Sequence, residues 1–179
     1  STAIDKYIYI TVNKKFDSRI RVSYSKTEIV EKVDDIQHDL VRESLRYLKI
    51  KGGVEITSIA DIPSEGTGLG SSSAFTVGLL NALYAYRGEH CSAKKLADAA
   101  CRIEIDIVKE PIGKQDQYIS SYGGLQFIEF HRDGDVYVDP IVCPKVFREK
   151  LNKNLMLFYL NITRRARTIL REQRDNIRE

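Results

Sequence analysis

The 179-residue chain has no tryptophan, one methionine and only three cysteines. An odd number of cysteines without metal-ligand spacing argues against a disulfide framework or a zinc site, and we expect reduced thiols, as in the cytoplasm. No apolar run approaches the roughly 20 residues that a membrane helix needs, which argues against a membrane protein. The net charge of +3 is too small to favour a nucleic-acid partner.

Apolar residues make up 42% of the chain, which is enough for a buried core. Asp34 and Asp35 are expected to cap the first helix, and Asp133-Gly134 to form a type I′ hairpin turn. The polar stretch 145–153 is predicted to be a connector at a domain boundary. Strands and helices alternate irregularly, which favours an α+β fold. The patterns predict strands at 6–12, 19–24, 27–33, 54–61, 125–131, 136–138 and 154–160, and helices at 36–48, 74–87, 92–107 and 163–179.

The most informative segment is PSEGTGLGSSSA, from Pro63 to Ala74. Glycines at every second position, Gly66, Gly68 and Gly70, permit a tight turn and a close approach of the backbone to a ligand. The helix that follows begins with amide donors and the positive end of its dipole, a combination that binds phosphate. The serine hydroxyls can donate to phosphate oxygens or coordinate magnesium. The lysine of a P-loop and the third glycine of a dinucleotide fingerprint are missing. On these residues alone, a glycine turn capped by serine is a competing interpretation.

Two carboxylates after this loop are candidates for phosphoryl-transfer chemistry, which needs a cation and a group that aligns the attacking hydroxyl. Glu104 lies on the apolar side of its predicted helix, so it needs a partner: a cation, or a base such as Arg102 or Lys109. Asp116 begins an element after a Pro/Gly break, where it can accept a proton or cap a helix. Lys114, two residues earlier, is expected to keep Asp116 ionised.

The loop resembles the phosphate-binding motif of the GHMP kinases, whose core is Gly-Leu-Gly-Ser-Ser between a strand and a buried helix. Residues 113–117, Gly-Lys-Gln-Asp-Gln, are similar to the Gly-x-x-Asp-Gln pattern of that family, and Glu104 lies at the matching spacing. The resemblance implies a GHMP-kinase N-terminal domain (ribosomal protein S5 domain 2-like). It also implies Mg²⁺ held by Ser72 and Glu104, and Asp116 as the catalytic base or hydroxyl-orienting group. The residues implied to bind ATP are Gly66, Thr67, Gly68, Leu69, Gly70, Ser71, Ser72 and Ser73.

Further stretches, among them residues 24–28 and 121–125, resemble the sugar-1-kinases of bacterial heptose metabolism. The implied reaction transfers the γ-phosphate of ATP to the anomeric hydroxyl of D-glycero-D-manno-heptose 7-phosphate. The alternatives are another GHMP kinase, of the fucokinase or galactokinase type, and an inactive fragment that acts only as a binding module. The residues expected to contact the phosphorylated sugar are Lys114, Gln115, Gly123, Gly124 and Arg164.

The resemblance also implies a domain organisation. Residues 1–150 correspond to the N-terminal ATP-binding domain without its first strands, and residues 151–179 to the start of the C-terminal domain. We therefore expect a chain truncated at both ends, with weak catalysis by itself. An unpaired sheet edge or an apolar patch is expected near residues 6–12, left open or covered by a second copy in a homodimer.

Overall fold

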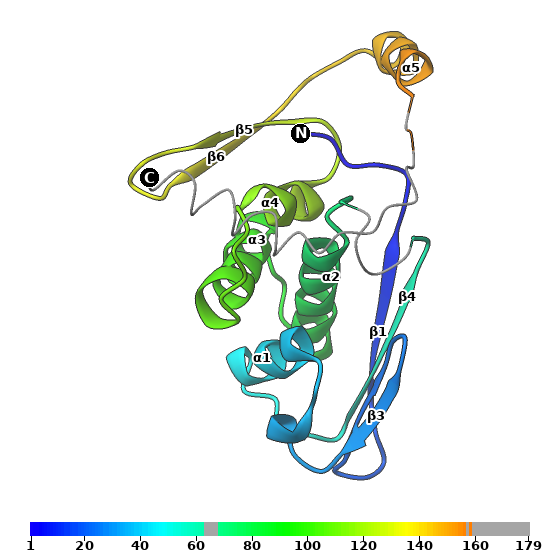
Figure 1. Cartoon of the computed structure of the whole chain (residues 1–179), viewed down its shortest axis with the longest axis vertical. Helices are drawn as coiled ribbons and strands as arrows, with labels where there is room; N and C mark the ends of the chain where they lie inside the picture. The colour runs from blue at the N-terminus through cyan, green and yellow to red at the C-terminus, as the bar shows by residue number, and fades with distance from the viewer. Residues whose placement is uncertain (63–67, 157, 159–179) are drawn as a thin grey trace.

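The computed structural model describes residues 1–62, 68–156 and 158. Its main sheet has four strands in the order β1-β4-β2-β3. β4 pairs antiparallel with β1 and parallel with β2, while β2 and β3 form an antiparallel pair. Figure 1 shows this sheet along one side of the molecule, with the helices packed on the other. The strands are β1 (Ile8–Lys14), β2 (Ile20–Ser23), β3 (Thr27–Val30) and β4 (Val54–Ala60).

The alternation of side chains divides the sheet into a covered face and an open face. Inward-pointing residues such as Ile20 and Ile56 are fully buried. On the open face the cross-strand neighbours Tyr9 and Ile59 are 53% and 66% exposed. Among the described residues, β1 has a strand partner on one side only. The expected unpaired edge near residues 6–12 is therefore confirmed.

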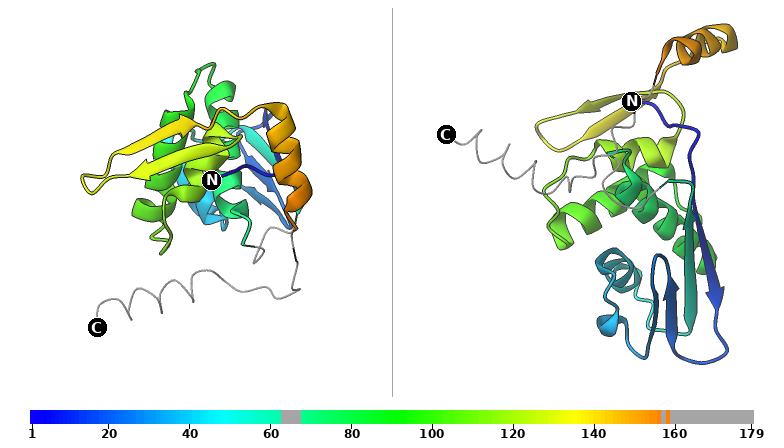
Figure 2. Two further views of the ribbon diagram at one scale, coloured as in Figure 1. Left: turned by 90° about the horizontal axis from the view of Figure 1, so that it is seen from above. Right: turned by 45° about the vertical axis from the view of Figure 1, so that its right-hand side comes forward.

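The covered face packs against α2 (Ser71–Tyr86), which is buried on most sides, as its apolar sequence predicted. Gly78 allows a close approach to β1, because a Cβ at this position would lie 3.3 Å from Cγ1 of Ile10. The other flanks of α2 contact α1 (Asp39–Tyr47) and α3 (Ala93–Cys101). Figure 2 shows these helices gathered around α2. The start of α2 is thereby held in a fixed position relative to the sheet.

The first helix begins later than the sequence predicted. Val33–Asp35 form a short 3-10 turn, η1, and α1 starts only at Asp39. The two aspartates of that turn are therefore not the cap of the helix. The carboxylate of Glu28 accepts hydrogen bonds from the amides of Gln37 and His38 instead, at 2.6 and 3.2 Å. A side chain of the preceding strand, β3, thus satisfies the amides that lead into the helix.

The second half of the helix predicted at 92–107 is not an α-helix. After α3 the chain forms a π-helical segment, η2 (Arg102–Ile107), in which the amide of Val108 donates to the carbonyl of Ile103 at 2.9 Å. A π turn holds more residues than an α turn, so it rotates the following side chains around the axis. Glu104 is fully buried, whereas Ile107, expected to face inward, is 41% exposed. The π turn directs Glu104 toward the start of α2.

After η2 the chain forms α4 (Gln115–Tyr122) and a hairpin of β5 (Gln126–Phe130) and β6 (Val136–Pro140), which lies over α4 in Figure 1. The hairpin is confirmed, but its turn is not type I′, because only Gly134 has a positive φ, 98°. The amide of Gly134 donates to the backbone carbonyl of His131, and the amide of His131 donates to the backbone carbonyl of Asp135. This pattern is a type I turn followed by a left-handed glycine, in a three-residue loop.

The polar stretch 145–153 is not a connector but a helix, α5 (Lys145–Asn154). Its long, straight side chains have high helix propensity. In Figures 1 and 2, α5 stands apart from the other helices. Its apolar side chains are exposed, with Phe147 at 62%. The expected boundary after residue 150 lies within α5. The strand predicted at 154–160 is not formed by its described residues, because Asn154 ends α5 and Leu155, Met156 and Phe158 belong to no helix or strand. The helix predicted at 163–179 lies outside the described residues.

Candidate active site

The start of α2 forms the first part of the site. Gly70 is its N-cap residue and has a left-handed backbone, with φ 71° and ψ 21°. The first amides of a helix have no acceptor in a preceding turn, so they are available to an anion. Gly66 and Thr67 lie outside the described residues. The other residues predicted to bind ATP lie at this end of α2: Gly68, Leu69, Gly70, Ser71, Ser72 and Ser73.

Asp116, the second residue of α4, lies directly against this glycine. A Cβ built on Gly70 would be 3.2 Å from Cγ and 3.3 Å from Oδ2 of Asp116. The N-terminal ends of α2 and α4 therefore meet with a carboxyl group between them. Part of the Asp116 side chain reaches solvent, yet desolvation by its surroundings raises the pKa of the carboxyl above the ordinary aspartate value. A raised pKa makes the carboxylate a better proton acceptor.

Lys114 does not have the predicted effect on Asp116. Its ammonium group donates a hydrogen bond to the carbonyl of Gly134, at 3.3 Å, in the turn between β5 and β6. A nearby cation would lower the pKa of an aspartate, whereas the pKa of Asp116 is raised. The lysine thus attaches the hairpin turn to the start of α4.

Glu104 is the buried centre of the site, with 0% exposure. Its Oε1 accepts a hydrogen bond from Thr76 at 2.6 Å, and its Oε2 accepts from Ser73 at 2.8 Å and from the side-chain amide of Gln117. The Ser72 hydroxyl is 3.5 Å from Oε1, at the limit of hydrogen bonding. Side chains from α2 and α4 therefore surround one carboxylate.

The partners of Glu104 rule out one of the two interpretations that the sequence left open. Among the described residues no basic side chain pairs with Glu104, so neither Arg102 nor Lys109 forms the alternative ion pair. The hydroxyl of Ser73 is committed to Glu104. Only the backbone amide of Ser73 is therefore left to contact a phosphate.

The residues present fit a magnesium ion completed by phosphates. Magnesium prefers oxygen ligands and often takes one or two carboxylates, with phosphates and waters as the rest. Ser72 is exposed at the mouth of α2, and its hydroxyl faces Oε1 of Glu104. No cluster of three or more His, Cys, Asp or Glu able to hold a metal occurs in the described part of the chain. A cation at Ser72 and Glu104, which remains a prediction, would depend on the nucleotide for its other ligands.

Sequence reasoning missed two residues of the site, Thr76 and Gln117. A weak signal for both exists. Thr76 follows Ser72 by four residues, so both lie on one face of α2. Gln117 follows Asp116 on α4, where successive side chains point about 100° apart, so one can face the mouth while the other faces the core. Both are polar residues inside apolar helix faces, which normally have a buried partner.

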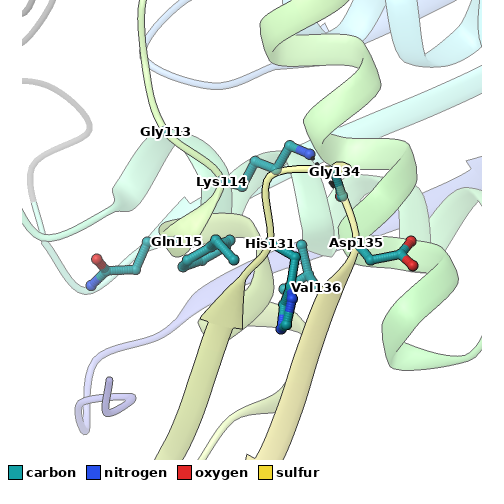
Figure 3. Close-up of a pocket in the computed structure, with 8 residues that line it drawn as sticks. Gly113, Lys114, Gln115, His131, Gly134, Asp135 and Val136 are labelled. Carbon is teal, nitrogen blue, oxygen red and sulfur yellow. Dashed lines mark hydrogen bonds between the residues drawn. The ribbon is translucent and has the colours of Figure 1, made fainter.

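The residues predicted to contact the sugar do not all lie at the same end of α4. Gln115 and Lys114 line an open cavity of about 390 Å³ between the start of α4 and the hairpin turn (Figure 3). Gly123 and Gly124 lie at the other end of α4, about 10 Å along its axis from Asp116 at 1.5 Å per residue. Both have a positive φ, 68° and 64°, which accounts for glycine in this turn. Arg164 lies outside the described residues.

Residues 36–124, which include Ser72, Glu104 and Asp116, match the family described as GHMP kinases N terminal domain. The chain belongs to the GHMP kinase family. It is 29% identical to a D-glycero-alpha-D-manno-heptose 7-phosphate kinase of Campylobacter jejuni, over 94% of this chain and 53% of that protein. It is 30% identical to a mevalonate kinase of Methanothermobacter thermautotrophicus, over 74% of this chain and 43% of that one.

Solved structures show the same fold. A D-glycero-D-manno-heptose 1-phosphate kinase from Bacteriodes thetaiotaomicron superimposes with a TM-score of 0.76 at 23% identity, over 84% of this chain and 53% of the other. The predicted α+β GHMP-kinase N-terminal fold is thus confirmed. The chain spans about half the length of the curated relatives that it matches. None of the described helices combines the length and the hydrophobicity of a membrane span.

Proposed function

We propose that this GHMP family member is an ATP-dependent kinase that phosphorylates a hydroxyl of a small sugar phosphate, D-glycero-D-manno-heptose 7-phosphate being the favoured substrate. One observation carries the proposal: a Cβ built on Gly70, at the mouth of α2, would lie only 3.2 Å from Cγ of Asp116, so the carboxyl lies next to the start of that helix. A phosphate on the first amides of that helix would be next to a proton acceptor. This juxtaposition is what phosphoryl transfer requires.

In this proposal, different residues bind the phosphates, hold the cation and accept the proton. The loop and the first amides of α2 hold the phosphates of ATP, and Ser72 with Glu104 holds Mg²⁺, which neutralises phosphate charge when bound. The sugar hydroxyl oxygen forms a bond to the γ-phosphorus while the bond from that phosphorus to the β,γ-bridging oxygen breaks. ADP leaves with the electron pair of that bond, and the hydroxyl proton passes to Asp116.

The choice of sugar follows the names of the relatives. The Campylobacter relative is named for heptose 7-phosphate, and the Bacteriodes structure for heptose 1-phosphate. Phosphorylation at the anomeric hydroxyl fits the first name. Lys114 and Gln115 flank Asp116 on the side of the hairpin cavity, where the remainder of a sugar phosphate would extend. Fucose, galactose and mevalonate are alternative substrates within the family.

Calorimetry of Mg²⁺-ATP binding and a coupled assay of ADP release test the proposal. ATP should bind the wild-type chain and the D116N variant with similar affinity, because Asp116 contacts the acceptor rather than the donor. ADP release should be fastest with heptose 7-phosphate in a panel with heptose 1-phosphate, fucose, galactose and mevalonate, and D116N should lack it. The absence of ATP binding to the wild-type chain would contradict the proposal and favour the binding-module alternative. Cytoplasmic location, a homodimer and the lack of nucleic-acid or membrane partners remain predictions.

A further inference from the structure

Gln117 is a fully buried polar side chain whose place is not explained by packing. Its amide nitrogen donates to Oε2 of Glu104, while its own Oε1 has no hydrogen-bond partner among the described residues. Buried polar atoms without a partner are rare in folded proteins. A leucine would fill a similar volume without leaving such an atom. The amide therefore matters at this position as a donor to Glu104.

The two carboxylate oxygens of Glu104 have different hydrogen-bond partners. Oε2 accepts from both Ser73 and Gln117, which uses its two lone-pair directions. Oε1 accepts one short bond, from Thr76 at 2.6 Å, and faces the exposed hydroxyl of Ser72 at 3.5 Å. Oε1 is thus the oxygen with the weaker second partner, and that partner, Ser72, is exposed in the first turn of α2.

We propose that Gln117 is a positioning residue that fixes the rotation of the Glu104 carboxylate, so that Oε1 is presented beside Ser72 to the cation of a bound nucleotide. This inference rests on the proposed function. Without the Gln117 donor, Oε2 keeps a single partner and the carboxylate can turn about its terminal bond. The oxygen pair that the cation would meet is then no longer held in place. Partners that orient a metal-binding carboxylate typically change metal affinity by 10- to 100-fold.

Binding of Mn²⁺ to the complex of the chain with a non-hydrolysable ATP analogue tests this role. The free Mn²⁺ signal in electron paramagnetic resonance gives the affinity without any turnover. Q117L should weaken Mn²⁺ binding about tenfold, the lower end of that range. Analogue binding in the presence of EDTA should stay within twofold of the wild-type value. A merely structural role would not separate these two measurements.

Gln126 supplies a matched control. It is another buried glutamine, 8% exposed, and its amide nitrogen donates to the carbonyl of Gly123 at 2.9 Å, at the other end of α4. Q126L loses a buried amide donor without touching Glu104, so its Mn²⁺ affinity should remain within twofold of wild type. If Q117L does not fold, S73A removes the other donor to the same oxygen and should weaken Mn²⁺ binding in the same direction.

The possible results are distinguishable. Unchanged Mn²⁺ affinity in a folded Q117L, or in S73A when Q117L does not fold, overturns the positioning role and leaves the kinase proposal intact. Equal weakening in Q117L and Q126L also overturns it, because the effect would then reflect general loss of stability. A wild-type chain that binds neither the analogue nor Mn²⁺ in its presence overturns the proposed function and this inference together.

Discussion

Replacement of Gly70 by alanine is the most direct perturbation of the contact on which the proposed chemistry depends. The new methyl group would lie 3.2 to 3.4 Å from three atoms of Asp116. This is tighter than ordinary carbon contacts, so the aspartate must move by a few tenths of an ångström. Because part of its side chain already reaches solvent, we expect the carboxyl to move outward, away from the mouth of α2.

Gly88 provides a control for the backbone cost. Its φ is 74°, close to the 71° of Gly70, but nothing lies within 4 Å of a Cβ built there. A left-handed alanine costs about 1–2 kcal/mol at either position. For a chain of this size, each 1 kcal/mol lowers the unfolding temperature by about 2–4 °C. G70A and G88A should therefore lose similar stability in urea unfolding, and only G70A should displace Asp116.

The two variants are then compared in turnover and in the titration of Asp116. A misplacement of 1 Å can cost about 100-fold in rate, so a few tenths of an ångström should cost G70A roughly threefold to tenfold relative to G88A. Carboxyl NMR should show the pKa of Asp116 falling toward the ordinary aspartate value in G70A, because the displaced group is better hydrated. Equal turnover and an unchanged pKa in both variants would refute the placement of Asp116.

T76V should lose about 1.5–3 kcal/mol in urea unfolding, because it leaves a buried carboxylate without its 2.6 Å donor, whereas T57V on the open sheet face should change stability by less than about 0.5 kcal/mol. The pKa of Asp116 is raised in the folded protein, so folding disfavours the ionised carboxylate. D116N should therefore be more stable than the wild type at pH 7. This gain in stability should vanish as the pH falls below 3.8, where the carboxyl is protonated in both the folded and the unfolded chain. Equal stabilities at pH 7 would contradict the raised pKa. Burial raises the pKa of the Cys101 thiol to about 12, so iodoacetamide at pH 8 should alkylate Cys101 more slowly than the partly exposed Cys143, as mass spectrometry would show.

The parts of the fold that sequence could predict are those encoded locally. The β-branched and aromatic residues at 6–12 and the alternation in 19–24 predicted β1 and β2, and the apolar run after Gly70 predicted the buried helix α2. The glycines at every second position predicted a tight turn before that helix, and Gly70 has a left-handed backbone there. These features depend on neighbours in sequence, which is why periodicity and composition were sufficient.

The parts that were missed depend on contacts distant in sequence. An α-helix and a π-helix differ in one hydrogen-bond register, and the hydroxyls of α2 that surround Glu104 are not visible in the sequence of η2. The start of α1 depends on the side chain of Glu28 in β3, which a helical periodicity in residues 36–48 does not reveal. Lys114 could be expected to act on Asp116 from its spacing, but it contacts the hairpin turn instead. That Ser72, Glu104 and Asp116 belong together was thus predictable from the sequence, and their mutual orientation was not.

A titration of the isotope-labelled chain with Mg²⁺-ATP, followed through its backbone amide resonances, tests the central claim most directly. The account predicts binding, with the largest shifts at Gly70 and Ser72, and with smaller shifts at Glu104 and Asp116, which adjoin the start of α2. Saturable binding with shifts confined to α5 or to the hairpin of β5 and β6, or no binding at all, would contradict it.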